Sequence, residues 1–186
     1  EFIPVASSRS IGRKIPFNGR EYSVIGLEEA VEAKPDIALF SAGGNISITW
    51  APLFAGAGCT VIDNSSAWRM AEGVPLIIPE INPEKLSLTD KIIANPNCST
   101  IQMLMALAPL HRKFGIRRIV VSTYQSVTGS GLKALKQLRD ESEGQAADPA
   151  YPHPIYNNCL PQCADFEEND YTTEEMKLLN ESRKIL

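Results

Sequence analysis

The sequence has few cysteines, little excess charge and no long apolar run. Four cysteines in 186 residues are too few for a disulfide scaffold, and none forms a Cys-x-x-Cys pair, so we expect no metal site. A net charge of −4 and a pI of about 5.3 provide no general attraction to nucleic acid or to an anionic membrane. No apolar stretch approaches the ~20 residues of a membrane-spanning helix. We therefore expect a soluble, cytoplasmic protein without nucleic-acid or membrane partners.

Short apolar runs bounded by Gly, Pro or Asn recur through the first two thirds of the chain. These runs predict strands at residues 2–7, 36–42, 59–65, 75–81 and 91–96. Helical patterns at 28–33 and 45–58 lie between several of them. Nearly continuous apolar strands alternating with helices are typical of a parallel sheet. The predicted fold class is α/β, with a partial Rossmann-like parallel sheet.

The second part of the chain has a different pattern. After Cys98 comes an apolar helical segment, expected to be buried on nearly all sides and to be kinked or ended early by Pro109. Residues 116–131 predict a strand that runs into a Gly/Ser loop, and a helix follows at 132–144. We place a domain change near Cys98, which gives a partial dinucleotide-binding domain at 1–97 and the start of an α+β catalytic and dimerisation domain at 98–186.

The two ends of the sequence are also informative. The chain opens on an apolar strand-like run, and it closes in a helical pattern that begins with a capping box, Thr172-x-x-Glu175. No Gly or Pro stop signal follows that helix. We therefore expect this chain to be the middle of a longer protein. Cys159 and Cys163, separated by Pro161, are expected to be core thiols.

Cys98 lies in the stretch "IIANPNCSTIQ", between a predicted strand and a predicted helix. At a helix start, backbone N–H groups and the helix dipole favour an anion, here a thiolate. The same N–H groups can stabilise the oxyanion that forms when a thiolate attacks a carbonyl. A buried structural cysteine is the alternative, and position alone does not decide between the two.

The polar residues that follow the predicted strands indicate a ligand site. In open α/β sheets, ligands bind beyond the carboxyl ends of the strands. Each predicted strand here turns abruptly polar at that end, for example in "SAGG" (41–44) and "DNSS" (63–66). We expect these ends to form one rim around a ligand crevice, although surface loops are polar for other reasons as well.

Several motifs together resemble a known family. They are "SSRSIGR", "SAGG", "DNSSAWRM", "VPLIIPEIN", "NPNCSTIQ", "STYQSVTGSG" and the ending "DYTTEEMKLLNESRKIL", in this order. With these motifs the chain closely resembles bacterial aspartate-semialdehyde dehydrogenases over essentially all 186 residues. The resemblance implies NADPH-dependent reductive dephosphorylation of L-aspartyl-β-phosphate to aspartate semialdehyde.

The resemblance also implies roles for individual residues. Cys98 would attack the substrate carbonyl and form a thioester, and Gln125 would position the substrate beside it. Arg69 would bind phosphate, for which a guanidinium is suited because it forks onto two oxygens. Ser66 and Asn97 are expected in the same pocket. Without the resemblance, a salt bridge for Arg69 and a strand-end hydrogen bond for Gln125 would be the simpler interpretations.

The choice of cofactor can be argued from the residues. NAD enzymes of this architecture place an acidic residue after the second strand, whereas an arginine there accommodates the 2′-phosphate of NADP. The segment Ser8-Arg9-Ser10 contains no acid, so NADP is expected. Gly43 and Gly44 would let the backbone approach the dinucleotide. By the resemblance, Thr128 and Gly129 would lie near the nicotinamide.

Part of the implied machinery is absent from this sequence. The Gly-rich phosphate loop would precede Glu1, and the histidine acting as general acid/base would follow Leu186; neither His111 nor His153 matches it. We therefore expect the activity to belong to a longer parent protein.

These 186 residues by themselves are expected to be inactive, because no group in them matches that acid/base. By the resemblance, the second domain would form a homodimer. Two rivals remain open at this stage. One is an N-acetyl-γ-glutamyl-phosphate reductase, which uses a similar cysteine-bearing turn, and the other is a non-catalytic dimerisation or assembly module.

Overall fold

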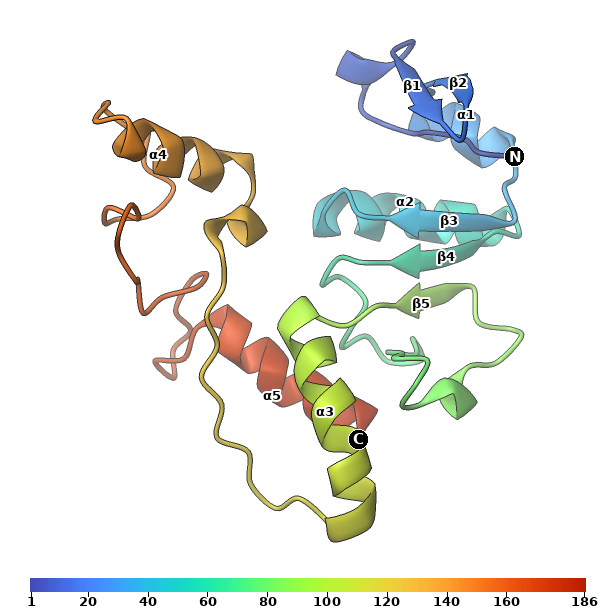
Figure 1. Ribbon diagram of the computed structural model, residues 1–186. Coiled ribbons are helices and arrows are strands. Elements are labelled where there is room, and N and C mark those ends of the chain that lie inside the picture. Colours follow the sequence, from blue (N-terminus) through green and yellow to red (C-terminus); the bar gives the residue numbers. More distant parts are fainter. The chain divides into compact units, whose positions relative to one another are not determined.

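The computed structural model describes residues 1–186 and divides the chain into two compact units. The first comprises Glu1–Arg112 together with Leu178–Leu186, and the second comprises Lys113–Lys177. The first unit is α/β, whereas the second contains helices and irregular segments (Figure 1). None of the helices has both the length and the apolar character needed to cross a bilayer.

A parallel three-stranded sheet organises the first unit. Strands β3 (Ile37–Phe40), β4 (Thr60–Asp63) and β5 (Ile92–Ala94) are hydrogen-bonded in the order β3-β4-β5. Both pairings are parallel, so the carboxyl ends of all three strands point to the same side (Figure 1). The strands predicted at 36–42, 59–65 and 91–96 are therefore confirmed, and so is the parallel sheet.

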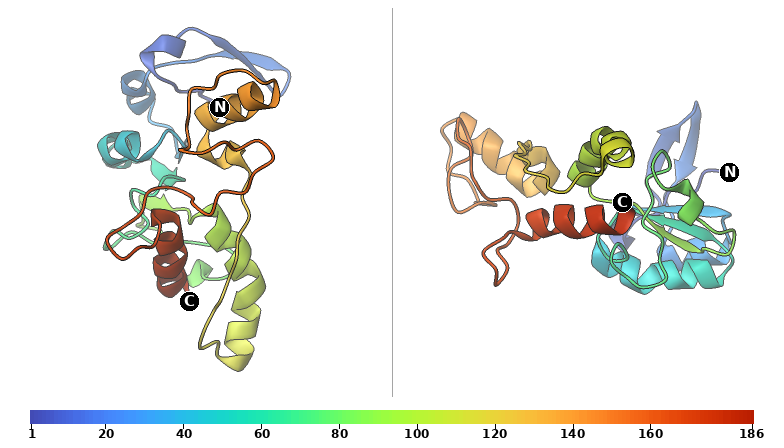
Figure 2. Two further views of the ribbon diagram at one scale, coloured as in Figure 1. Left: turned by 90° about the vertical axis from the view of Figure 1, so that its left-hand side faces the viewer. Right: turned by 90° about the horizontal axis from the view of Figure 1, so that it is seen from below.

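Helices α1 (Leu27–Glu32) and α2 (Gly44–Gly56) confirm the two helices predicted in this region. The α2 helix connects β3 to β4 and lies along one face of the sheet (Figures 1 and 2). Its apolar residues pack against the strands in a core of Ala30, Phe40, Ala51, Phe54, Cys59 and Val61. This packing fixes the positions of the strand ends.

A second apolar core holds the last part of this unit together. It contains side chains from the segment after β4, from β5, from α3 (Cys98–Phe114) and from α5 (Thr173–Ile185). Its buried members are Leu76, Ile78, Ile81, Ala94, Leu104, Ala108 and Ile185. The end of α5 is therefore packed in the same core as the middle of α3.

An antiparallel hairpin near the N-terminus was not predicted. It consists of β1 (Lys14–Phe17) and β2 (Arg20–Ser23), joined by Asn18-Gly19. Both turn residues have positive φ, 49° and 74°, as a type I′ hairpin turn requires. An Asn-Gly pair between two short strands is a strong hairpin signal, and the sequence did contain it.

Two predicted strands are wrong. Residues 2–7 form only one isolated parallel bridge, Val5 to Ile25, next to a short 3-10 helix, η1 (Ser8–Ser10). Residues 75–81 also form a single bridge, Leu76 to Ala94, before η2 (Pro83–Lys85). Apolar composition predicted burial correctly in the second case, but a strand also needs a partner along its whole length.

The α3 helix also differs from the prediction. It runs through Pro109 to Phe114, so the proline does not end it early. Only one stripe of the helix, including Leu104 and Ala108, is buried, whereas Met105 and Phe114 are exposed. An apolar sequence on every face therefore does not bring burial on every face.

In the second unit, residues 116–125 form no strand, which contradicts the prediction; η3 (Val127–Ser130) follows them. A strand requires a hydrogen-bonding neighbour, and no other segment of this unit is a strand. The predicted helix at 132–144 is confirmed as α4 (Leu132–Ser142). Cys159 is exposed and Cys163 is half-buried, so the expectation of core thiols is wrong for Cys159.

The predicted capping box at the start of α5 is confirmed. The Thr172 N–H donates to Glu175 Oε2 at 2.7 Å, and the Glu175 N–H donates to Thr172 Oγ1 at 3.3 Å. The backbone N–H and then the hydroxyl of Thr172 hold the pKa of Glu175 below its ordinary value. The ionised carboxylate therefore stabilises the start of this helix.

The lowered pKa of Glu175 predicts that its contribution to stability depends on pH. A carboxyl with a lowered folded-state pKa contributes stability above its unfolded pKa and loses it as the pH falls through the folded pKa. The stability difference between wild type and Glu175→Gln should thus be constant at neutral pH and shrink under acid conditions. Urea unfolding at a series of pH values measures it, and a difference that persists at low pH would contradict the prediction.

Candidate active site

Cys98 is the first residue of α3, immediately after the Asn95-Pro96-Asn97 turn that leaves β5. The Oδ1 atom of Asn97 accepts hydrogen bonds from the N–H groups of Ser99, at 2.9 Å, and Thr100, at 3.3 Å. Asn97 therefore caps the helix, and the thiol beside it is exposed. A thiol in this place is accessible to a substrate and lies at the positive end of a helix dipole.

A buried ion pair lies directly behind this turn. Arg69 Nη1 and Glu181 Oε1 are 3.0 Å apart, and both side chains are almost fully buried. The other carboxylate oxygen of Glu181 accepts the Asn97 N–H at 2.7 Å. Glu181 thereby joins the residue before Cys98 to Arg69.

Arg69 also holds the ends of two strands together. Its Nε donates to the Asn95 carbonyl at 2.9 Å, and its Nη2 donates to the Asn64 carbonyl at 3.1 Å. A guanidinium has five N–H groups, so one on Nη1 and one on Nη2 remain after these three bonds. Arg69 thus connects the ends of β4 and β5 to α5. Its predicted role in binding phosphate stays a prediction.

The turn between β4 and Arg69 is fixed by hydrogen bonds of its own. Ser65 Oγ donates to Asp63 Oδ2 at 2.6 Å and accepts from the Ala67 N–H at 3.2 Å. Ser66, the predicted helper, lies between these residues and is exposed. Ser66 and Arg69 therefore belong to one rigid turn at the carboxyl end of β4.

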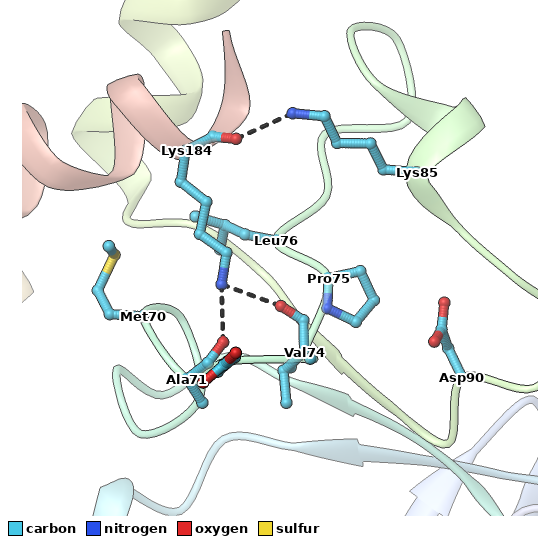
Figure 3. Close-up of a pocket in the computed structure, with 10 residues that line it drawn as sticks. Met70, Ala71, Val74, Pro75, Leu76, Lys85, Asp90 and Lys184 are labelled. Atoms are coloured by element: carbon cyan, nitrogen blue, oxygen red, sulfur yellow. Dashed lines mark hydrogen bonds between the residues drawn. The ribbon is translucent and has the colours of Figure 1, made fainter.

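Lys184, one turn after Glu181 on α5, holds the segment 69–74 in place. Its Nζ donates to the carbonyl oxygens of Arg69, Ala71 and Val74 at 2.8, 3.0 and 3.0 Å (Figure 3 draws the last two bonds). Burial lowers the pKa of Lys184, and the nearby charge of Lys85 lowers it further. Both lysines line an open cavity of about 430 Å³ that includes none of the predicted site residues.

The sequence analysis did not single out Glu181 or Lys184. The only local signal was their i, i+3 spacing, which puts two opposite charges on one face of a predicted helix. Such spacing is common on solvated helices. Only the folded chain shows that this face is turned toward Arg69 and the 69–74 segment.

The predicted cofactor residues of the first unit lie in two places. Ser8, Arg9 and Ser10 form η1, in which Ser8 and Arg9 are exposed. Gly43 precedes α2 with a φ of 92°, a conformation that L side chains rarely adopt, and Gly44 begins the helix. No side chain caps the start of α2, so its first N–H groups are available to a ligand.

The remaining predicted residues, Gln125, Thr128 and Gly129, belong to the second unit. Ser126 caps η3 by accepting the Thr128 N–H. The Gln125 side chain lies against Gly129 so closely that a Cβ added to the glycine would be 2.0 Å from Gln125 Nε2. Glycine at 129 therefore leaves the space that this orientation of Gln125 occupies.

The first unit thus defines a class of protein: an α/β domain with an exposed cysteine at the start of a helix, which follows the carboxyl end of a strand in a parallel sheet. Comparison with known proteins identifies the family. Residues 1–89 match the semialdehyde dehydrogenase NAD-binding domain, and residues 107–186 match the semialdehyde dehydrogenase dimerisation domain.

Individual relatives agree with these matches. The chain is 51% identical to the aspartate-semialdehyde dehydrogenase of Aquifex aeolicus and 47% identical to that of Shewanella violacea, in each case over 100% of this chain and 57% of the relative. The crystal structure of aspartate semialdehyde dehydrogenase II from Vibrio cholerae superposes with a TM-score of 0.90 at 45% identity, covering 98% of this chain and 57% of that one. The chain therefore belongs to the aspartate-semialdehyde dehydrogenase family, and it spans little more than half the length of these relatives.

Proposed function

We propose that the whole protein to which this chain belongs reduces L-aspartyl-4-phosphate to L-aspartate 4-semialdehyde with NADPH and releases phosphate. The observation that carries this proposal is the exposed thiol of Cys98 at the capped start of α3, in a chain of this family. One solved relative, the Vibrio cholerae enzyme, is described as complexed with ASA. Lysine, threonine and methionine biosynthesis would use the product.

In the proposed reaction the Cys98 thiolate attacks the acyl-phosphate carbonyl carbon. The bond from that carbon to the phosphate oxygen breaks, phosphate leaves, and a thioester with Cys98 remains. The N–H groups at the start of α3 would stabilise the oxyanion of the addition step. Reduction of the thioester to an aldehyde requires a hydride, which is the chemistry that NADPH supplies, and the thiolate is then regenerated.

Arg69 and Ser66 are proposed to hold the phosphate group. Both lie on the turn that follows β4, and Arg69 retains two N–H groups after its bonds to Glu181, Asn95 and Asn64. Asn97 is proposed to act in the same pocket by fixing the start of α3. Gln125 is proposed to orient the substrate carbonyl.

NADP fits the residues that are present. The uncapped start of α2, preceded by a glycine with positive φ, suits a ligand bearing phosphate groups. Arg9, between Ser8 and Ser10 and with no acid in that segment, suits a 2′-phosphate. Thr128 and Gly129 are proposed to lie at the nicotinamide end. A related structure from Candida albicans is described as having NADP.

Two further assignments are part of the proposal. The match to a dimerisation domain over residues 107–186 supports a homodimer. Cytoplasmic localisation is proposed from the small number of cysteines in the sequence and from the biosynthetic reaction. The relatives named above favour the aspartyl substrate over N-acetyl-γ-glutamyl phosphate, and the exposed Cys98 favours an enzyme over a non-catalytic module.

An activity assay of the purified whole protein tests the proposal. Oxidation of NADPH is followed with L-aspartyl-4-phosphate and, separately, with N-acetyl-γ-glutamyl phosphate. We expect turnover with the first compound and little with the second. A preference for the second, or no turnover with either, would overturn the proposed function.

The contact between Gln125 and Gly129 leads to a specific prediction. In Gly129→Ala the new Cβ must displace the end of the Gln125 side chain, which is flexible, so unfolding stability should change by less than about 0.5 kcal/mol. If Gln125 orients the substrate, kcat/KM should fall by about 10- to 100-fold. Gly56→Ala is the matched control, because nothing lies within 4 Å of its added Cβ. Unchanged kinetics in Gly129→Ala would remove the proposed role of Gln125.

A further inference from the structure

The positive charge of Arg69 is already paired within the fold. Its ion pair in the structure is with Glu181, at 3.0 Å, and the two side chains are only 9% and 1% exposed. Water and salt screen a charge pair weakly when it is buried this deeply. The carboxylate therefore cancels much of the attraction that the guanidinium could exert on another anion.

Glu181 is also held in place from its other side. Its second oxygen, Oε2, accepts the Asn97 N–H at 2.7 Å. Asn97 is fixed in turn, because its Oδ1 atom accepts the N–H groups of Ser99 and Thr100 at the start of α3. Both carboxylate oxygens are thus in use, and the negative charge stays beside the guanidinium when an anion approaches.

A phosphate group bound to Arg69 would lie close to this fixed negative charge. After its three hydrogen bonds, Arg69 has one N–H on Nη1 and one on Nη2 left for a ligand. An anion bound there would share one guanidinium with the Glu181 carboxylate. A charge at ~4–6 Å shifts a protonation equilibrium by about 10- to 1,000-fold, and it should change phosphate binding by a comparable factor.

We propose that Glu181 lowers the phosphate affinity of Arg69, so that inorganic phosphate leaves after the thioester has formed. Without this carboxylate, Arg69 would bind the phosphate group of substrate and product more tightly alike, and slow release of phosphate would limit turnover. Glu181 acts through Arg69 and is therefore a positioning residue. This inference rests on the proposed function, in which Arg69 binds phosphate.

Calorimetric titration of the whole protein with inorganic phosphate tests the proposal. Glu181→Gln keeps the size of the side chain and one acceptor oxygen but removes the charge. It should bind phosphate about tenfold more tightly than wild type, or tighter still, and both kcat and KM for the acyl phosphate should fall. Glu181→Asp keeps the charge and should bind phosphate nearly as weakly as wild type. A residue that only supports the fold would instead weaken phosphate binding in both variants.

Stability provides a second measurement of the same effect. Glu181→Gln should be less stable than wild type, because the buried guanidinium loses its counter-charge. Its melting temperature should nevertheless rise more with added phosphate than that of wild type, because stabilisation by a ligand grows with the ratio of its concentration to its Kd. A melting series in phosphate therefore reports the affinity even of a variant that is too unstable for calorimetry.

Glu174→Gln is the matched control, since it removes an equal charge from the same helix, where Glu174 pairs with Lys177. It should bind phosphate like wild type, and equal tightening in this variant would reflect net charge alone and overturn the inference. The double variant Arg69→Met, Glu181→Leu should lose phosphate binding. If it does while Glu181→Gln binds no more tightly than wild type, the inference about Glu181 fails and the proposed function stands. If the double variant binds phosphate as wild type does, the proposed role of Arg69 fails instead.

Discussion

Cys98→Ser is expected to reduce kcat of the whole protein by about a thousandfold or more, with little change in stability. A serine hydroxyl is a far weaker nucleophile than a thiolate, and no acyl intermediate would form at a useful rate. Stability should be retained because the thiol is exposed and the cap of α3 is provided by Asn97. Steady-state kinetics and urea unfolding of the same samples measure the two effects.

Cys159→Ser is the matched control for this prediction. Cys159 is also a free, exposed cysteine, but it lies in an irregular segment rather than at the start of a helix. The Cys159→Ser variant should therefore keep wild-type kinetics. If Cys98→Ser retained more than a few per cent of activity, or if both variants lost activity equally, Cys98 would not be the nucleophile.

Glu181→Ala is expected to destabilise the protein by about 3–5 kcal/mol, because it leaves the buried guanidinium of Arg69 without its counter-charge. The variant also removes the acceptor of the Asn97 N–H, next to Cys98. Activity should fall together with stability. Denaturant unfolding of the whole protein measures the free energy of unfolding.

A double variant separates the structural role of the ion pair from a role in catalysis. Arg69→Met combined with Glu181→Leu replaces the two buried charges with apolar side chains, so most of the stability lost in Glu181→Ala should return. Activity should remain low, because Arg69 is proposed to bind phosphate. A double variant that regains full activity would show that the pair serves only the fold.

The sequence predicted the elements whose formation depends on local patterns. Strands β3, β4 and β5 are apolar runs bounded by turn residues, and α5 begins with a reciprocal Thr172–Glu175 cap. Such signals are contained within a few residues, so no knowledge of distant contacts is needed. The position of Cys98 at a helix start could be predicted for the same reason.

Elements that depend on a partner could not be predicted in this way. Residues 116–125 have a strand-like composition, but they have no neighbouring strand in their unit. The exposed face of α3 also carries apolar side chains such as Met105 and Phe114, so apolar composition alone did not indicate which face would be covered. Glu181 was missed because its importance comes from Arg69 and Asn97, both far away in the sequence.

The distance along the chain between Arg69 and Glu181 affects how the molecule matures during translation. The two residues are separated by 112 positions, and Lys184 emerges later still. At ~5–20 residues per second, a ribosome needs on the order of ten seconds to make that stretch. During this interval the guanidinium has no counter-charge and the 69–74 loop lacks its lysine. A nascent polypeptide therefore carries its reactive sulfur for some time before the surroundings that would make it a selective nucleophile are complete.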